Sequence, residues 1–296
     1  MICVEDGTPL SCDAMAVYPA AVTGPLPTEP PPWRTYKATT PRLEISLRRS
    51  GNPEGEKVVL LHGWAVHGGM FQQLRSHLED RFDLLVPDLR GHGDTEAPWD
   101  GYELDSLADD LAGLLDSEGI EEAHVIGYSW GGFVALAFAE RYPERLKRLG
   151  LLCTAPRYAA RWRRWGLGLM QGLWTILPPS TMQPITQHLL SGPDLPDGMG
   201  RLVQWLMAGN TRAGLAGGAR GMRRADLRPG LGNLHHPTLL VTGGRDIAVQ
   251  ESDWRVLLAQ VKGLCHHHLE DAGHGLAASH SAPLGTILRA FLLEPK

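Results

Sequence analysis

The chain has 296 residues, 43% of them hydrophobic and 21% charged, and its net charge is −5. This composition indicates one large globular unit with an ample core. The acidic balance and the lack of a recognised motif argue against nucleic-acid binding. The sequence also lacks a secretory start and a membrane-length apolar run, so we expect a cytoplasmic protein without membrane association.

The first 40 residues differ in character from the rest. Residues 25–32 are too rich in proline for a helix or strand, so we expect residues 1–40 to form a proline-rich extension of uncertain order. Apolar residues at 43, 45 and 47 then alternate with polar ones, which predicts an early, half-exposed strand. We place the core of the protein in residues 41–155 and 236–296.

Strand and helix patterns alternate through the first part of this core. Residues 57–61 form an apolar strand that runs into the turn His62-Gly63-Trp64, and residues 83–87 form another that runs into a Gly-His-Gly turn. Leucines at 104, 107, 111 and 114 form a stripe at helical spacing. Alternation of this kind predicts crossover helices and a mostly parallel sheet.

The most informative segment is Gly127-Tyr128-Ser129-Trp130-Gly131. It follows an apolar run at 124–126 and precedes a helical pattern at 132–140, the strand–turn–helix context of a nucleophile elbow. A serine at such a strained turn needs neighbours without a Cβ, and glycines 127 and 131 meet that need. We therefore interpret Ser129 as a nucleophile, and a plain Gly/Ser turn is the alternative.

A serine nucleophile needs a general base and a group that orients the base, and both follow in the chain. A strand over residues 239–242 ends in glycines and Asp246, and His274 lies in a glycine-flanked loop. We assign Asp246 as the orienting acid, with a turn cap as the alternative, and His274 as the base. Asp271 is so close to His274 in sequence that it is expected to shape the loop, and no carboxylate follows the strand at 148–153.

Residues 156–235 interrupt the alternation with helical stretches and prolines. They contain ten arginines against three aspartates, a net charge of +7 that leaves −12 on the rest of the chain. One interpretation is the recognition of an anion, with Arg161, Arg163, Arg164 and Trp165 as candidate substrate contacts. The other is a solvated helical face whose arginine stems cover apolar surface.

No metal or organic cofactor is expected. The tract His266-His267-His268 is the nearest approach to a metal motif, but successive strand side chains point to opposite faces, so the three rings do not converge on one ion.

Taken together, these motifs resemble the α/β-hydrolase superfamily, of the lid-bearing serine esterase type. The resemblance covers about residues 42–293 and includes residues 88–95, DLRGHGDT, which are similar to the family's D-x-R-G-x-G-x-S. Serine in the elbow argues against haloalkane dehalogenases and epoxide hydrolases, which use a carboxylate nucleophile. The implied fold is a mostly parallel central sheet flanked by helices, with residues 156–235 as a helical lid.

The resemblance also implies an oxyanion hole made by the backbone N–H groups of Trp64 and Trp130. Their side chains would then be free to shape the pocket walls. His62 and Tyr128 are further candidate substrate contacts, although a histidine such as His62 more often fixes loop geometry. A weaker similarity to the pimeloyl-[acyl-carrier protein] methyl ester esterases adds an acidic carrier protein as a candidate partner for the basic lid.

The implied chemistry is hydrolysis of a carboxylic ester of a small acyl substrate through an acyl-enzyme. Two alternatives remain open. The same residues serve C–C bond hydrolases, lactonases and thioesterases that act on anionic or carrier-bound acyl substrates. A non-catalytic binding protein can also keep this fold.

Overall fold

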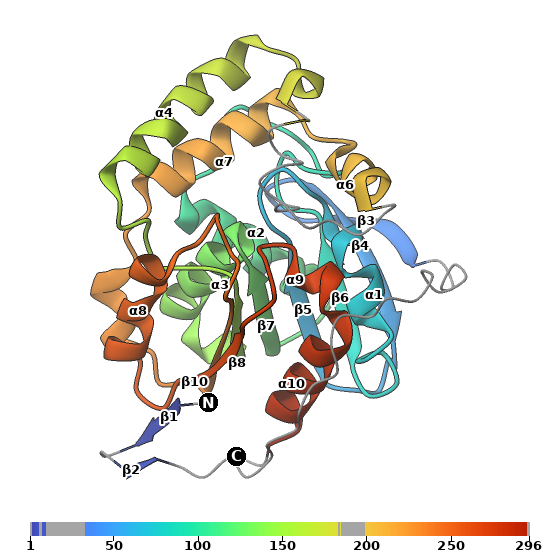
Figure 1. Cartoon of the computed structure of the whole chain (residues 1–296). Coiled ribbons are helices and arrows are strands. Elements are labelled where there is room, and N and C mark those ends of the chain that lie inside the picture. The colour runs from blue at the N-terminus through green and yellow to red at the C-terminus, as the bar shows by residue number, and fades with distance from the viewer. Residues whose placement is uncertain (1, 6–7, 10–32, 183, 185–198, 295–296) are drawn as a thin grey trace.

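The computed structural model of the chain describes residues 2–5, 8–9, 33–182, 184 and 199–294 (Figure 1). Within them a single sheet has the strand order β2-β1-β10-β9-β8-β7-β5-β6-β4-β3. The strands are β1 (Ile2–Glu5), β2 (Thr8–Pro9), β3 (Arg34–Thr39), β4 (Glu44–Gly51), β5 (Lys57–Leu61), β6 (Asp83–Pro87), β7 (Ala123–Tyr128), β8 (Leu146–Leu152), β9 (Thr238–Gly243) and β10 (Cys265–Leu269).

The middle of the sheet is parallel, as the sequence predicts. Every pairing from β10 through β9, β8, β7 and β5 to β6 is parallel, whereas β4, β3, β1 and β2 pair antiparallel at the two edges. Parallel neighbours require crossover connections, and helices supply them. The helices of the core are α1 (Gln72–Arg75), α2 (Leu104–Ser117), α3 (Trp130–Arg141), α8 (Glu251–Gln260), α9 (Leu276–Ser279) and α10 (Ser281–Leu293).

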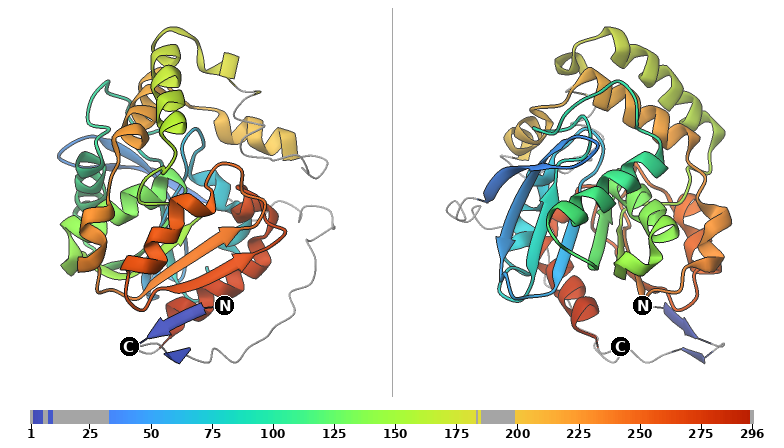
Figure 2. Two further views of the ribbon diagram at one scale, coloured as in Figure 1. Left: turned by 60° about the vertical axis from the view of Figure 1, so that its left-hand side comes forward. Right: turned by 180° about the vertical axis from the view of Figure 1, so that it is seen from behind.

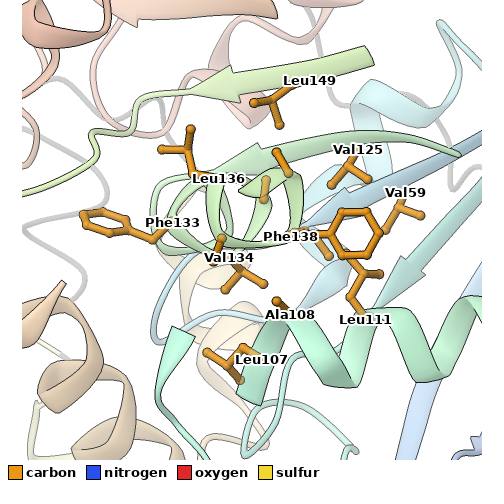
Figure 3. Packing of buried hydrophobic residues seen from close by; sticks show 14 of the residues in the cluster. Val59, Leu107, Ala108, Leu111, Val125, Phe133, Val134, Leu136, Phe138 and Leu149 are labelled. Carbon is orange, nitrogen blue, oxygen red and sulfur yellow. The ribbon is translucent and has the colours of Figure 1, made fainter. Parts of the chain in front are cut away.

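Both faces of the sheet are buried, which explains why its central strands are continuously apolar. In β5, Val59 and Leu61 pack on the face covered by α2, α3 and α8. Val58 and Leu60 pack on the opposite face with side chains of α1, α9 and α10. Figure 3 shows side chains of α3 interleaved with those of α2 and of the neighbouring strands.

The structure corrects two expectations about the N-terminal part. Residues 34–39 form β3, which pairs with β4, so the sheet begins before residue 41. The expected strand over 43–47 is present, but it is not half-exposed, because Ser46 and Arg48 are buried as well. The Ser46 N–H donates to Thr95 Oγ1, and Arg48 forms an ion pair with Asp88. The proline-rich tract at 25–32 lies outside the described residues.

Helices between β8 and β9 form a layer over one end of the core. They are α4 (Arg161–Ile176), α6 (Met199–Met207) and α7 (Arg212–Arg224). In Figure 1, α7 lies between the core and α4, and α4 stays outermost in both views of Figure 2. Among the described residues, none of the helices has the length and apolar character needed to cross a membrane.

Candidate active site

Ser129 lies between β7 and α3 in a strained conformation, with φ 51° and ψ −115°. Both glycines of the turn lie so close to neighbouring backbone atoms that a side chain would not fit. A Cβ at Gly127 would lie 2.3 Å from the Gly131 carbonyl oxygen, and one at Gly131 would lie 2.3 Å from the Leu61 carbonyl oxygen. Any larger residue would push the elbow away from β5, so this geometry explains the small residues on both sides of the serine.

The structure brings Ser129, His274 and Asp246 together in one hydrogen-bonded chain. His274 Nε2 lies 3.0 Å from Ser129 Oγ, and His274 Nδ1 lies 2.8 Å from Asp246 Oδ2. Ser129 and His274 are each only 7% exposed. These distances lie within hydrogen-bond reach, so the three groups have the mutual geometry that an activated serine requires.

Asp246 is held as a carboxylate by several donors. Its Oδ1 accepts from the N–H groups of Ala248 and Val249 at 2.8 and 2.9 Å. Burial alone would raise the pKa of Asp246, but the nearby His274 and these hydrogen bonds outweigh burial and leave the pKa below its ordinary value. The acid therefore stays charged and can hold the imidazole in one orientation.

The turn after β5 lies directly beside Ser129. A Cβ at Gly63 would lie 3.4 Å from Ser129 Cβ, so the Gly63–Trp64 peptide borders the nucleophile. On the other side, Trp130 is the first residue of α3, where a backbone N–H has no partner within the helix. Both proposed oxyanion donors are thus residues that adjoin the serine.

His62 lies under this turn. It is fully buried, its Nε2 accepts from the Leu89 N–H at 2.8 Å, and its Nδ1 lies 2.7 Å from the Gly63 carbonyl oxygen. Because Nε2 is an acceptor, the proton resides on Nδ1 and is donated to Gly63. Burial, and then the nearby His92, lower the pKa of His62 to about 3, so the ring is neutral. Of the two roles considered for His62, this geometry favours the fixing of the loop.

Two aromatic side chains differ from expectation. Trp130 is buried in the core and is not free to line a pocket wall, whereas Trp64 is half-buried and its indole N–H donates to the Leu215 carbonyl of α7 at 3.1 Å. The Tyr128 hydroxyl donates to the His274 carbonyl at 2.5 Å. Tyr128 therefore fixes the histidine loop, and its only polar atom is used internally.

The arginines of α4 separate into two groups. Arg163 forms an ion pair with the buried Asp253 and stacks on Tyr158, so the interpretation of Arg163 as a substrate contact does not match its placement. Arg161, Arg164 and Trp165 instead border a hollow of about 420 Å³ between α4 and α7. Its other lining residues are Gly168, Leu169 and Arg223, and none of Ser129, Asp246 and His274 belongs to it.

Three arginines, Arg161, Arg164 and Arg223, line this hollow. None of the ion pairs formed within residues 33–182 and 199–294 involves Arg161, Arg164 or Arg223. Partial burial and the charges of Arg157, Arg161 and Arg228 lower the pKa of Arg164, and the charge of Asp226 opposes this only in part. The three guanidinium groups that line the hollow make it electrostatically complementary to a bound anion.

Residues at the end of β8 also form hydrogen bonds with Ser129 and Asp246. The sequence did not indicate these contacts. The Ser129 N–H donates to the Leu152 carbonyl at 2.8 Å, and Thr154 Oγ1 donates to the Ser129 carbonyl at 2.7 Å. The Cys153 thiol hydrogen-bonds to Asp246, and burial raises its pKa, so it is a thiol and not a thiolate. Although ligand atoms of Cys153, Asp246 and His274 lie within 4.8 Å of one another, a protonated thiol is a poor metal ligand.

Comparisons with known proteins identify the family of this fold. The family described as alpha/beta hydrolase fold matches residues 57–280. A pimeloyl-[acyl-carrier protein] methyl ester esterase of Neisseria meningitidis is 30% identical over 253 residues, which cover 83% of this chain and 96% of that protein.

Solved structures show the same fold. A hydrolase of Pseudomonas aeruginosa has a TM-score of 0.82 at 23% identity and covers 88% of this chain and 99% of its own. An enol-lactonase of Burkholderia xenovorans has a TM-score of 0.80 at 24% identity, and the match covers 88% of this chain and 100% of that one. With the elbow, the parallel sheet and the family match, the chain belongs to the α/β-hydrolase fold family.

Proposed function

We propose that this carboxylic ester hydrolase works through an acyl-enzyme formed on Ser129, with His274 as general base and Asp246 as the residue that orients it. The hydrogen-bonded chain from Ser129 Oγ through His274 to Asp246 is the observation that carries the proposal. In an open α/β sheet, groups at the carboxyl ends of the strands adjoin the ligand site, and these residues follow β7, β9 and β10.

In the first half of the reaction, His274 Nε2 takes the Ser129 proton while Oγ attacks the ester carbonyl carbon. The carbonyl oxygen becomes an oxyanion, which the N–H groups of Trp64 and Trp130 stabilise, each by about 3 kcal/mol. Asp246, whose pKa is below its ordinary value, stabilises the imidazolium that forms. His274 then protonates the leaving alcohol, so that the acyl group stays on Ser129.

In the second half, His274 takes a proton from water, and the resulting attack on the acyl carbonyl releases the acid and restores Ser129. Water must reach a site whose serine is only 7% exposed. The helical layer of α4, α6 and α7 covers this end of the core, so we assign it the role of a lid that controls entry.

The experiment that tests the reaction is hydrolysis of p-nitrophenyl esters, from acetate to decanoate, by wild type and Ser129→Ala. We expect wild-type activity, an optimal chain length that reports the pocket size, and loss of activity in the variant. Ser117→Ala, in which a serine on α2 is altered, is the matched control and should behave as wild type. Activity that survives in Ser129→Ala would contradict the mechanism, and inactivity of wild type on every ester would favour a non-catalytic binder.

For the substrate we propose an acyl group presented on an acidic carrier protein, which docks on the hollow between α4 and α7. Arg161, Arg164 and Arg223 line this hollow and form no ion pair with any other described residue, and Trp165 and Leu169 add apolar surface. The name of the Neisseria relative, which refers to an acyl-carrier protein, supports the same class of partner.

Two substrates, one carrier-linked and one small, allow docking to be tested separately from the chemistry. Arg161→Glu/Arg164→Glu should lower kcat/KM for a carrier-linked methyl ester at least about tenfold, yet keep p-nitrophenyl butyrate activity. The wild-type advantage on the carrier-linked ester should shrink as salt shortens the Debye length from about 10 Å at 0.1 M to about 3 Å at 1 M. Arg255→Glu on α8 is the control, and an equal loss there would reject docking on the hollow.

A further inference from the structure

One face of α7 consists of glycine. Residues 214, 217, 218 and 221 share a face because they recur at helical spacing. Glycine is among the poorest helix formers, so a helix that keeps four on one face needs a packing reason. The reason is the close approach of this face to the core, which any side chain would prevent.

Two of these glycines contact the indoles of the proposed oxyanion donors. A Cβ at Gly218 would lie 2.5 Å from Trp64 Cδ1 and 2.8 Å from its Nε1. A Cβ at Gly221 would lie 2.5 Å from Trp130 Cη2. The backbone of one helix of the lid therefore packs directly on both side chains whose main-chain N–H groups adjoin Ser129.

The turn that carries Trp64 is held to the lid at further points. The Trp64 indole N–H donates to the Leu215 carbonyl at 3.1 Å, and its ring meets Trp174 of α4 edge-on at 6.2 Å. Asn210 Nδ2 donates to the carbonyl of Ala65 at 2.7 Å, and Ala65 has a positive φ of 63°. A strained turn keeps its shape only when its surroundings hold it, and here the lid does so.

We infer that Gly218 and Gly221, two residues of the glycine face of α7, position the oxyanion hole: they fix the Trp64 and Trp130 indoles, and through them the two main-chain N–H groups. This inference rests on the proposed function, because it assigns a task to the lid within that mechanism. Trp64 and Trp130 act on the oxyanion by their backbone, whereas Gly218 and Gly221 are positioning residues that act through the indoles.

The arrangement also connects docking to catalysis. Arg223 lines the hollow between α4 and α7 and lies two residues beyond Gly221 on the same helix. A carrier that binds the hollow therefore contacts the helix that fixes the oxyanion donors. Stabilising α7 in this position is expected to raise kcat for the carrier-linked ester more than for a small ester.

Gly218→Ala tests the inference. The new methyl group forces Trp64 to move by about 1 Å, and a displacement of this size costs roughly 10- to 100-fold in rate. We expect kcat on p-nitrophenyl butyrate to fall by this factor, with KM changed less than about threefold, because the oxyanion exists only in the transition state. The inhibition constant of phenylboronic acid, which forms a tetrahedral adduct on the serine, should rise in parallel.

Gly217→Ala is the matched control. Its Cβ would lie 2.2 Å from Tyr102 Cγ, an overlap at least as severe on the same helix, but the displaced ring belongs to no oxyanion donor. We expect this variant to lose as much thermal stability as Gly218→Ala while it keeps kcat within about threefold. Equal kcat losses in the two variants would overturn the inference and leave only a general packing role for α7.

Trp64→Phe provides a second measurement, so that the test does not depend on the correct folding of Gly218→Ala alone. It removes the hydrogen bond to Leu215, and combined with Gly218→Ala its effect should be less than additive, because both act on one contact. Full additivity would also overturn the inference. Active-site titration of each variant separates lost folding from lost rate, and an inactive wild type or an active Ser129→Ala would point to failure of the proposed mechanism.

Discussion

His62 Nδ1 lies 2.7 Å from the carbonyl oxygen of Gly63, the residue that follows it. In a trans peptide the C=O and N–H groups point in opposite directions, so a donor that holds the Gly63 carbonyl also sets the direction of the Trp64 N–H. The Leu89 N–H in turn fixes the other ring nitrogen. A buried histidine thus orients a proposed oxyanion donor through the peptide that carries it.

His62→Phe should therefore lower kcat. The change leaves the peptide without its donor, and we expect a loss of about tenfold or more, below the roughly 10²- to 10³-fold typical of removing an oxyanion donor outright. His62→Gln, whose amide can donate and accept, should recover part of the loss. Steady-state kinetics on p-nitrophenyl butyrate provide the measurement, and wild-type kcat in His62→Phe would refute this role.

Stability should depend on His62 at acidic pH. Its pKa is about 3 in the folded protein against 6.5 ordinarily, so between these values the unfolded chain binds a proton that the folded protein does not. The free energy of unfolding must then fall as the pH drops from 6.5 toward 3. Between pH 7 and 4.5, His62 should account for about 3 kcal/mol of this fall in the free energy of unfolding. Urea unfolding should show a flatter pH dependence in His62→Gln, and an unchanged one in the exposed control His235→Gln.

Asp246→Asn tests the choice of the orienting acid. An amide can neither stabilise the imidazolium nor hold its tautomer, so kcat should fall by about 10⁴-fold with little change in KM. Asp271 is the competing carboxylate, but its Oδ1 lies 3.5 Å from His280 Nε2, in the loop that holds His274. We expect Asp271→Asn to stay within about threefold of wild type. A larger loss of kcat in Asp271→Asn than in Asp246→Asn would identify Asp271 as the orienting acid.

Much of this site was predictable because its signals are local. The strand–turn–helix pattern around Ser129 and the turn after β5 depend on residues that are neighbours in the sequence. The partner of Arg163 was not predictable, since Asp253 lies 90 residues away and is brought there by the fold. For the same reason the buried state of Ser46 and Arg48 depends on Thr95 and Asp88, which alternation within β4 does not reveal. The glycines of α7 were visible, but their contacts depend on where the layer of α4, α6 and α7 packs on the core.

The ion pair between Arg163 and Asp253 predicts a difference between neighbouring arginines of α4. Asp253 is fully buried; it also accepts from the Ala159 N–H at 2.7 Å and from the Gln250 N–H at the start of α8. Arg163→Ala leaves this carboxylate buried without its cation, and removing one partner of a buried pair costs about 3 kcal/mol. Arg161→Ala alters an exposed side chain and should change the free energy of unfolding by less than about 0.5 kcal/mol. Urea unfolding of the two variants makes the comparison. Equal stabilities would mean that water or another group compensates Asp253, and that α4 is not anchored to α8 by this pair.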